Sequence, residues 1–133
     1  MGRWRYLLFY LLGGIVATYA LTLFNPSTAE VLFGASGAIA GVLGGYILLY
    51  PRARVLTLIF IIFFVTLIEV PAVVMLGLWF LQQIYFGAAD LSDPTGGGVA
   101  YFAHVGGFAF GLIFIRAFAT RIRGGSEPRL PVY

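Results

Sequence analysis

The chain contains no cysteine and no lysine, and only 10% of its residues carry a charge. Without cysteine, disulfides, thiolate metal sites and cysteine nucleophiles are excluded. So few charges cannot supply the polar surface of a soluble domain. Of the 133 residues 61% are hydrophobic, and the mean hydropathy is +0.98. This composition indicates a membrane protein whose surface mostly faces lipid.

The basic residues are all arginines, and each of them lies at the edge of an apolar run. They are Arg3, Arg5, Arg52, Arg54, Arg116, Arg121, Arg123 and Arg129. A nucleic-acid-binding protein would gather such charges on one polar face. Arginines that flank apolar segments instead set membrane orientation, because cytoplasmic loops carry an excess of positive charge. We therefore expect the lipid bilayer as a partner, and no nucleic acid.

Four apolar segments are expected to cross the membrane as helices: Tyr6–Phe24, about Gly34–Tyr50, about Ala72–Phe86 and about Val99–Ala117. The first follows two arginines, as a signal peptide would, but it is longer than the usual apolar region of one. At about 28 Å it matches the hydrocarbon core of a bilayer. The sequence thus predicts an all-α, polytopic membrane helix bundle over residues 1–117. A basic, disordered cytoplasmic tail is expected over residues 118–133.

The apolar segment Val55–Phe86 leaves two topologies open. As one helix it would be roughly 48 Å long, too long for a straight crossing, and Glu69 and Pro71 divide it. It forms either two crossings, or one crossing after a connecting segment, Val55–Ile68, that lies partly in the membrane. The single crossing is preferred, because it places every arginine on the cytoplasmic side. Glu69 either faces a membrane cavity, or lies at a helix end or in the interface, where water satisfies it.

Ser36 and His104 are the candidate catalytic residues. The chain has one histidine, and Ser36 is the serine that falls within a predicted spanning helix. An ionisable residue inside a membrane segment is a functional candidate, because burying it unpaired is costly. A neutral imidazole can accept the proton of a serine hydroxyl and so activate the oxygen as a nucleophile. In the single-crossing topology both residues lie near the outer face at similar depth, which favours catalysis over a role as polar contacts between helices.

Small residues at four-residue spacing accompany both candidates. Gly37, Gly41 and Gly45 follow Ser36, while Ala103, Gly107 and Gly111 surround His104. Such stripes allow two membrane helices to approach backbone to backbone. The stripes are either general membrane packing or the means by which the serine and the histidine meet.

Two motifs resemble the catalytic helices of prokaryotic rhomboid intramembrane serine proteases: GASGAIAGVLGGY, with Ser36, and AHVGGFAFG, with His104. The stretches YPRARV and PAVVMLGLWFLQQ resemble the same family. The resemblance implies that Ser36 is the nucleophile and that His104 is the general base and then the general acid. It also implies that Gly34 and Gly37 shape the turn at the helix start, and that the backbone N–H of Ser36 holds the oxyanion.

The same resemblance assigns a substrate gate to the helix Ala72–Phe86, which Trp79 and Phe80 would line. It covers the last four of the six spanning helices usual in the family, so we expect that the first two helices, with their oxyanion-assisting histidine and asparagine, are missing. Ala40 stands where some members have a tyrosine that stacks on the histidine.

The sequence therefore predicts a serine endopeptidase that cleaves transmembrane proteins with a Ser36–His104 dyad, impaired by the absent helices. It is expected to be a multi-pass protein of a prokaryotic plasma membrane, without a metal or other cofactor. The alternative is a non-catalytic rhomboid-like protein that binds transmembrane helices. A channel or transporter is disfavoured, because no ring of charges or pair of broken helices marks an ion path.

Overall fold

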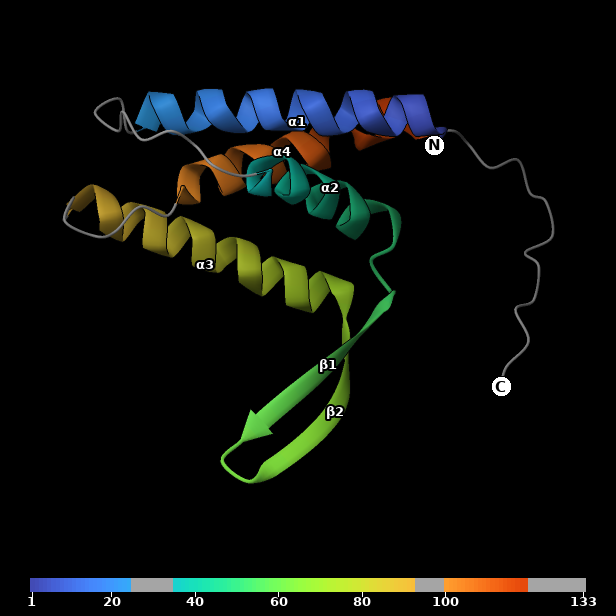
Figure 1. The fold of residues 1–133 in the computed structure, drawn as a ribbon, viewed down its shortest axis with the longest axis vertical. Helices are drawn as coiled ribbons and strands as arrows, with labels where there is room; N and C mark the ends of the chain where they lie inside the picture. Colours follow the sequence, from blue (N-terminus) through green and yellow to red (C-terminus); the bar gives the residue numbers. More distant parts are fainter. Residues whose placement is uncertain (25–34, 93–99, 120–133) are drawn as a thin grey trace.

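Four helices and one β-hairpin make up the described part of the molecule (Figure 1). The computed structural model describes residues 1–24, 35–92 and 100–119. In chain order the elements are α1 (Arg3–Phe24), α2 (Ser36–Leu49), β1 (Arg54–Ile61), β2 (Phe64–Pro71), α3 (Ala72–Ser92) and α4 (Tyr101–Phe118). The prediction of a helical membrane bundle is confirmed. The sequence also predicts a turn at residues 25–27 and a polar loop at residues 90–98. That turn, residues 93–98 of that loop and the tail from residue 120 lie outside the described residues.

Helices α1, α2 and α4 pack closely together, and α3 lies mainly against α4 (Figure 1). One apolar cluster joins α1 to α4 through Phe9, Phe110 and Ile115. A second joins α2, α3 and α4 through Ala40, Leu76 and Phe108. The helices thus share a core made of aromatic side chains and of small residues that let the backbones approach.

The helices differ in whether they are long enough to cross a bilayer. Three of those in the described ranges, α1, α3 and α4, are long and apolar enough to cross one. The expected second span is shorter than predicted, since α2 has 14 residues and a length of about 21 Å. Its small residues are buried among the other helices; they are Gly37, Ala38, Ala40, Gly41, Gly44 and Gly45.

The segment between α2 and α3 is an antiparallel hairpin, which the sequence did not predict. Arg54 pairs with Pro71 at its base and Ile61 with Phe64 at its tip, which leaves Ile62 and Phe63 as a two-residue turn. The hairpin projects away from the helices (Figure 1). The alternative with two crossings in Val55–Phe86 is wrong, because α3 is the one helix in this stretch. Asp90, expected in a loop, belongs to α3.

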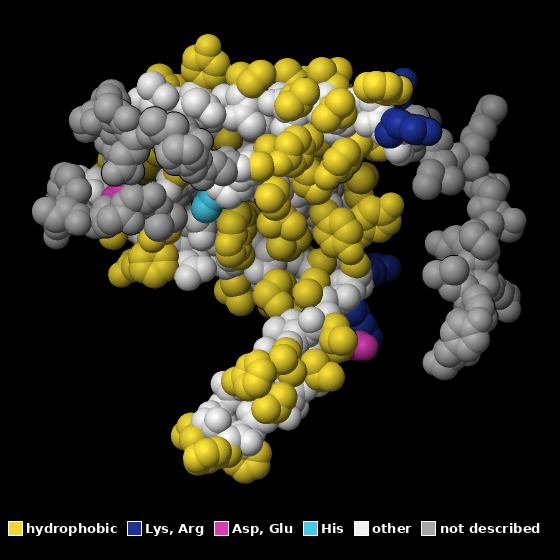
Figure 2. All heavy atoms as spheres, in the orientation of Figure 1, with side chains coloured by type: hydrophobic (Ala, Val, Ile, Leu, Met, Phe, Trp, Pro, Cys, Tyr) yellow, Lys and Arg dark blue, Asp and Glu magenta, His cyan; other side chains and the backbone are white. Residues whose placement is uncertain are grey.

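The arginines of the described residues gather at one end of the bundle, where α1 begins and α2 and α4 end (Figure 2). Arg3 lies in the first turn of α1, and Arg116 lies in the last turn of α4. Glu69 also lies near this end, in β2, where its Oε2 is 2.7 Å from a guanidinium nitrogen of Arg54. Glu69 thus lies neither at a helix end nor in a cavity, but in an exposed ion pair on the hairpin. The interfacial position stays a prediction.

Candidate functional site

Ser36 is the first residue of α2, and its side chain is exposed. Ala35 precedes it as the N-cap residue and makes no side-chain capping hydrogen bond. Backbone N–H groups in the first turn of a helix have no acceptor within that helix, and the helix dipole gives this end a partial positive charge. The N–H groups of Ser36 and Gly37 therefore lie where a developing negative charge would be stabilised. Gly34 lies outside the described residues.

His104 lies one turn into α4 and is half-buried. Its Nδ1 is 2.7 Å from Oε1 of Gln83, a residue of α3. Within the described residues no hydrogen bond joins His104 to the Ser36 hydroxyl. A side chain of α3 therefore binds the histidine, while the serine belongs to α2.

The neighbours of the two candidate residues lie close together, with room for little more than one methyl group between them. A Cβ atom placed on Gly37 would lie 3.4 Å from the carbonyl oxygen of Ala103 and 3.7 Å from its Cβ. Gly37 follows Ser36 in the chain and Ala103 precedes His104, so the two candidates lie at the same level on adjacent helices. Both are at the end of the bundle opposite to the arginines.

The glycines of the two stripes lie where α2 and α4 cross. A Cβ on Gly107 would collide with the carbonyl oxygen of Gly37, and one on Gly111 would collide with that of Gly41. A Cβ on Gly45 would lie 2.8 Å from the side chain of Ile115. Because the obstacles at Gly107 and Gly111 are backbone atoms, no side-chain rotation relieves these collisions, and only glycine permits this separation of the helices.

Trp79 and Phe80, the suggested gate residues, are both half-buried against α4. The ring centroid of Trp79 is 5.6 Å from that of His104. Phe80 stacks on Phe108, with centroids 4.5 Å apart and ring planes 20° apart. The aromatic neighbour of the imidazole therefore comes from α3, while Ala40 of α2 is fully buried beside Phe108.

Gln83 is a site residue that the sequence did not single out. Its side chain is 6% exposed, and it is the buried polar residue of the described part. Trp79, Phe80 and Gln83 occupy one face of α3, since residues three and four apart are neighbours on a helix. The sequence did carry a signal for Gln83, namely a polar residue on the same helix face as two apolar aromatic residues. The adjacent Gln82 weakened this signal, because the pair reads as an ordinary polar stretch.

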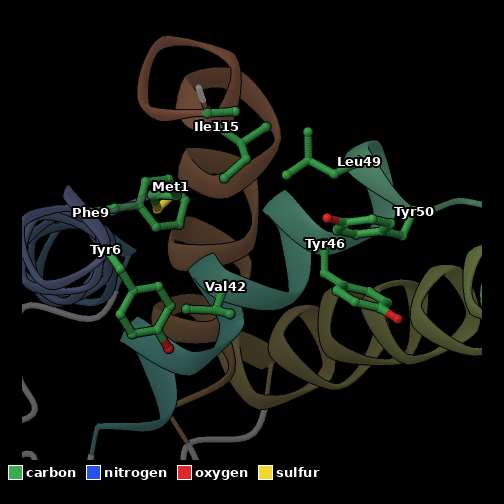
Figure 3. Close-up of a pocket in the computed structure, with 9 residues that line it drawn as sticks. Met1, Tyr6, Phe9, Val42, Tyr46, Leu49, Tyr50 and Ile115 are labelled. Carbon is green, nitrogen blue, oxygen red and sulfur yellow. The ribbon is translucent and has the colours of Figure 1, made fainter. Parts of the chain in front are cut away.

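An apolar pocket of about 480 Å³ lies at the other end of the bundle (Figure 3). Tyr6 and Phe9 of α1, Tyr46 of α2 and Ile115 of α4 line it. These residues lie near the start of α1 and the ends of α2 and α4, far from Ser36 and His104. The pocket is therefore separate from the candidate site. Across residues 1–24, 35–92 and 100–119, no three potential metal ligands come together.

The fold and the site define a polytopic membrane protein with a serine and a histidine at the same level of two tightly packed helices. A family model described as the Rhomboid domain matches residues 1–121. The chain therefore belongs to the rhomboid family, and it is a membrane protein. No curated protein and no solved structure matches it.

Proposed function

We propose that the protein is an intramembrane serine endopeptidase that cleaves transmembrane proteins near the membrane face opposite to the arginines. The observation that carries the proposal is the close approach of α2 to α4 at Gly37 and Ala103, because it supports a meeting of Ser36 with His104. Membership of a family of intramembrane proteases supports the same function.

In the proposed reaction, the Ser36 hydroxyl oxygen attacks the carbonyl carbon of the scissile peptide and passes its proton to Nε2 of His104. The carbonyl oxygen becomes an oxyanion, which the backbone N–H groups at the start of α2 stabilise. The C–N bond then breaks, and the leaving nitrogen takes the proton from His104. Water attacks the acyl-enzyme, again with His104 as the base, and releases the second product and free Ser36.

The test is cleavage of a transmembrane substrate after reconstitution into liposomes. We expect that the wild-type chain cuts a fluorogenic transmembrane peptide, and that Ser36→Ala and His104→Ala each reduce the rate to background. The matched control is Ser92→Ala, a serine in the last turn of α3 whose hydroxyl bonds its own helix. Cleavage that persists in Ser36→Ala would contradict the proposed nucleophile.

The second candidate function is binding of transmembrane helices without cleavage. The observation that favours it is the absence of a hydrogen bond between Ser36 and His104 within the described residues. Under this alternative, client membrane proteins co-purify equally with the wild type and with Ser36→Ala, and neither variant cuts them. The endopeptidase proposal instead requires that clients accumulate intact with Ser36→Ala alone.

A further inference from the structure

With the Gln83 amide oriented as the structure has it, the hydrogen bond between Gln83 and His104 assigns the proton to one imidazole nitrogen. Oε1 of an amide only accepts hydrogen bonds, so the Nδ1 atom that lies 2.7 Å away must be the donor. In a neutral imidazole the other nitrogen then has the lone pair. Nε2 is therefore the basic atom of His104, as the proposed reaction requires.

Burial strengthens this constraint. Gln83 is 6% exposed, and a buried amide left without a partner destabilises the folded protein. Trp79, one turn earlier on α3, packs beside the same ring, with 5.6 Å between the centroids. One helix face thus supplies both the hydrogen bond and the flat neighbour that limit rotation of the imidazole.

We propose that Gln83 is a positioning residue that keeps His104 in the Nδ1–H form, with Nε2 directed to accept the proton of Ser36. The expected effect of Gln83 on the reaction rate rests on the proposed function, whereas the expected tautomer of His104 does not. A purely structural glutamine would make the same hydrogen bond between helices. Its loss would then lower stability without slowing the reaction of Ser36.

The tautomer can be measured directly, because the chain contains a single histidine. Selective ¹⁵N-histidine labelling of the full chain in detergent gives one pair of ring nitrogen signals. We expect a protonated Nδ1 and an unprotonated Nε2 in the wild type, and a mixture of both tautomers in Gln83→Met, which keeps the size but removes the acceptor. Gln82→Met is the matched control. The side chain of Gln82 is exposed, so this variant should keep the wild-type spectrum.

The rate test uses the same variants with a fluorophosphonate that labels activated serines. We expect that Gln83→Met slows labelling of Ser36 by up to about 10²-fold, within the full contribution of a general base. Gln83→Glu retains an acceptor at the same place and should restore labelling to within about threefold of the wild type. Gln82→Met should label at the wild-type rate.

The outcomes separate the two proposals. An Nε2–H tautomer in the wild type, or an unchanged spectrum in Gln83→Met, overturns the positioning role whether or not the protein is active. Absence of Ser36 labelling in a wild type with the expected spectrum overturns the protease function and leaves the tautomer assignment standing.

A separate observation concerns the β-hairpin, whose two strands both carry exposed apolar side chains. Figure 2 shows those on one face. The tip is the most exposed part: Ile62 is 89% exposed, Phe63 95% and Phe64 78%. Among the described helices, only α3 contacts the hairpin. At the base of the hairpin the backbone N–H of Ala72 donates to the carbonyl oxygen of Ala53 at 2.7 Å.

Lipid is the partner that fits this surface. The hairpin leaves the bundle at its arginine end. Arg52 and Arg54 there outnumber Glu69, so the base of the hairpin carries a net positive charge. Such a charge attracts anionic lipid headgroups. The outer edges of a two-stranded sheet carry unpaired backbone groups, which cannot enter the hydrocarbon core. The side chains at the tip have no such restriction, and their contact with acyl chains removes them from water.

We infer that the hairpin lies in the interface of the leaflet at the arginine end, with Ile62, Phe63 and Phe64 dipping into the acyl region. The chain has no cysteine, so a single Phe63→Cys carries an environment-sensitive fluorophore without background. The full chain is reconstituted in phosphatidylethanolamine–phosphatidylglycerol vesicles with brominated acyl chains as quenchers. Ile113→Cys, exposed on α4, is the lipid-facing reference, and Gly2→Cys is the reference outside the helices.

We expect bromine quenching at Phe63→Cys to resemble that at Ile113→Cys and to exceed clearly that at Gly2→Cys. Quenching at Phe63→Cys as weak as at Gly2→Cys would overturn the inference. Energy transfer between labels on two chains, together with protection from brominated lipid, would also overturn it, because a second copy would then cover the hairpin.

Discussion

At the scale of single residues, the crossing of α2 and α4 depends on positions where even a methyl group does not fit. A Cβ on Gly111 would collide with the carbonyl oxygen of Gly41 and lie 2.8 Å from the backbone nitrogen of Gly45. Gly77 on α3 is different, since a Cβ there would have no neighbour within 4 Å. The two glycines form a matched pair with opposite expectations.

We predict that Gly111→Ala destabilises the protein by about 1–3 kcal/mol, because the helix backbones must move apart to accept the methyl group. Gly77→Ala should leave stability unchanged or raise it by up to about 1 kcal/mol, because alanine is the better helix former. Thermal unfolding in detergent micelles measures both variants. Equal melting temperatures for the two variants would contradict the close approach of α2 and α4.

The ion pair between Arg54 and Glu69 is the second residue-scale case. Both side chains are more than half exposed, at 72% and 53%, so water and salt screen their attraction. Exposed pairs of this kind contribute about 0–1 kcal/mol. We predict that Glu69→Gln changes neither proteolysis nor the melting temperature measurably. A loss of cleavage in this variant would show that Glu69 acts in the reaction.

At the scale of elements, the helices were predictable from the sequence and the hairpin was not. The helices have long apolar runs with arginines, proline or polar residues at their borders, and those signals place the helix ends within a few residues, α3 excepted. Residues 54–71 are apolar on both faces, so the alternation typical of a half-buried strand is missing. The turn residues Ile62 and Phe63 also lack the glycine or asparagine that marks a tight hairpin.

The sequence likewise indicated some residues of the candidate site and not others. Ser36 and His104 stand out because they are polar residues among small residues in apolar segments. Gln83 did not, because its partner is 21 residues away and only the packing of α3 on α4 brings the two together. The contact between Trp79 and His104 is likewise a product of tertiary packing rather than of spacing along the chain.

The turn of the hairpin gives an element-scale prediction. Ile62 has a φ of 53°, a left-handed conformation that costs an ordinary L-residue about 1–2 kcal/mol. Ile62→Gly should remove this cost and slow hydrogen–deuterium exchange of the amides that pair β1 with β2. Phe63→Gly is the control, since Phe63 has no positive φ. Faster exchange in Ile62→Gly would contradict the described turn.

At the scale of the whole molecule, the arginines lie at one end of the bundle and the candidate site at the other, so the bundle has a preferred orientation in a membrane. Positive charge is retained on the cytoplasmic side of membrane proteins. We predict that a membrane-impermeant maleimide, applied outside intact cells, labels Ala89→Cys near the end of α3. The same reagent should not label Ala53→Cys until the cells are opened. The reverse pattern would place the candidate site on the cytoplasmic side.

The proposed function requires Ser36 to act as a nucleophile in this bundle. The mass of the intact chain after exposure to a fluorophosphonate in proteoliposomes reports whether it does. We expect one covalent adduct, located on the peptide that contains Ser36. Ser36→Ala should abolish this adduct, and His104→Ala should strongly reduce it. An unmodified wild-type chain, or an adduct that persists in Ser36→Ala, would contradict the proposed function.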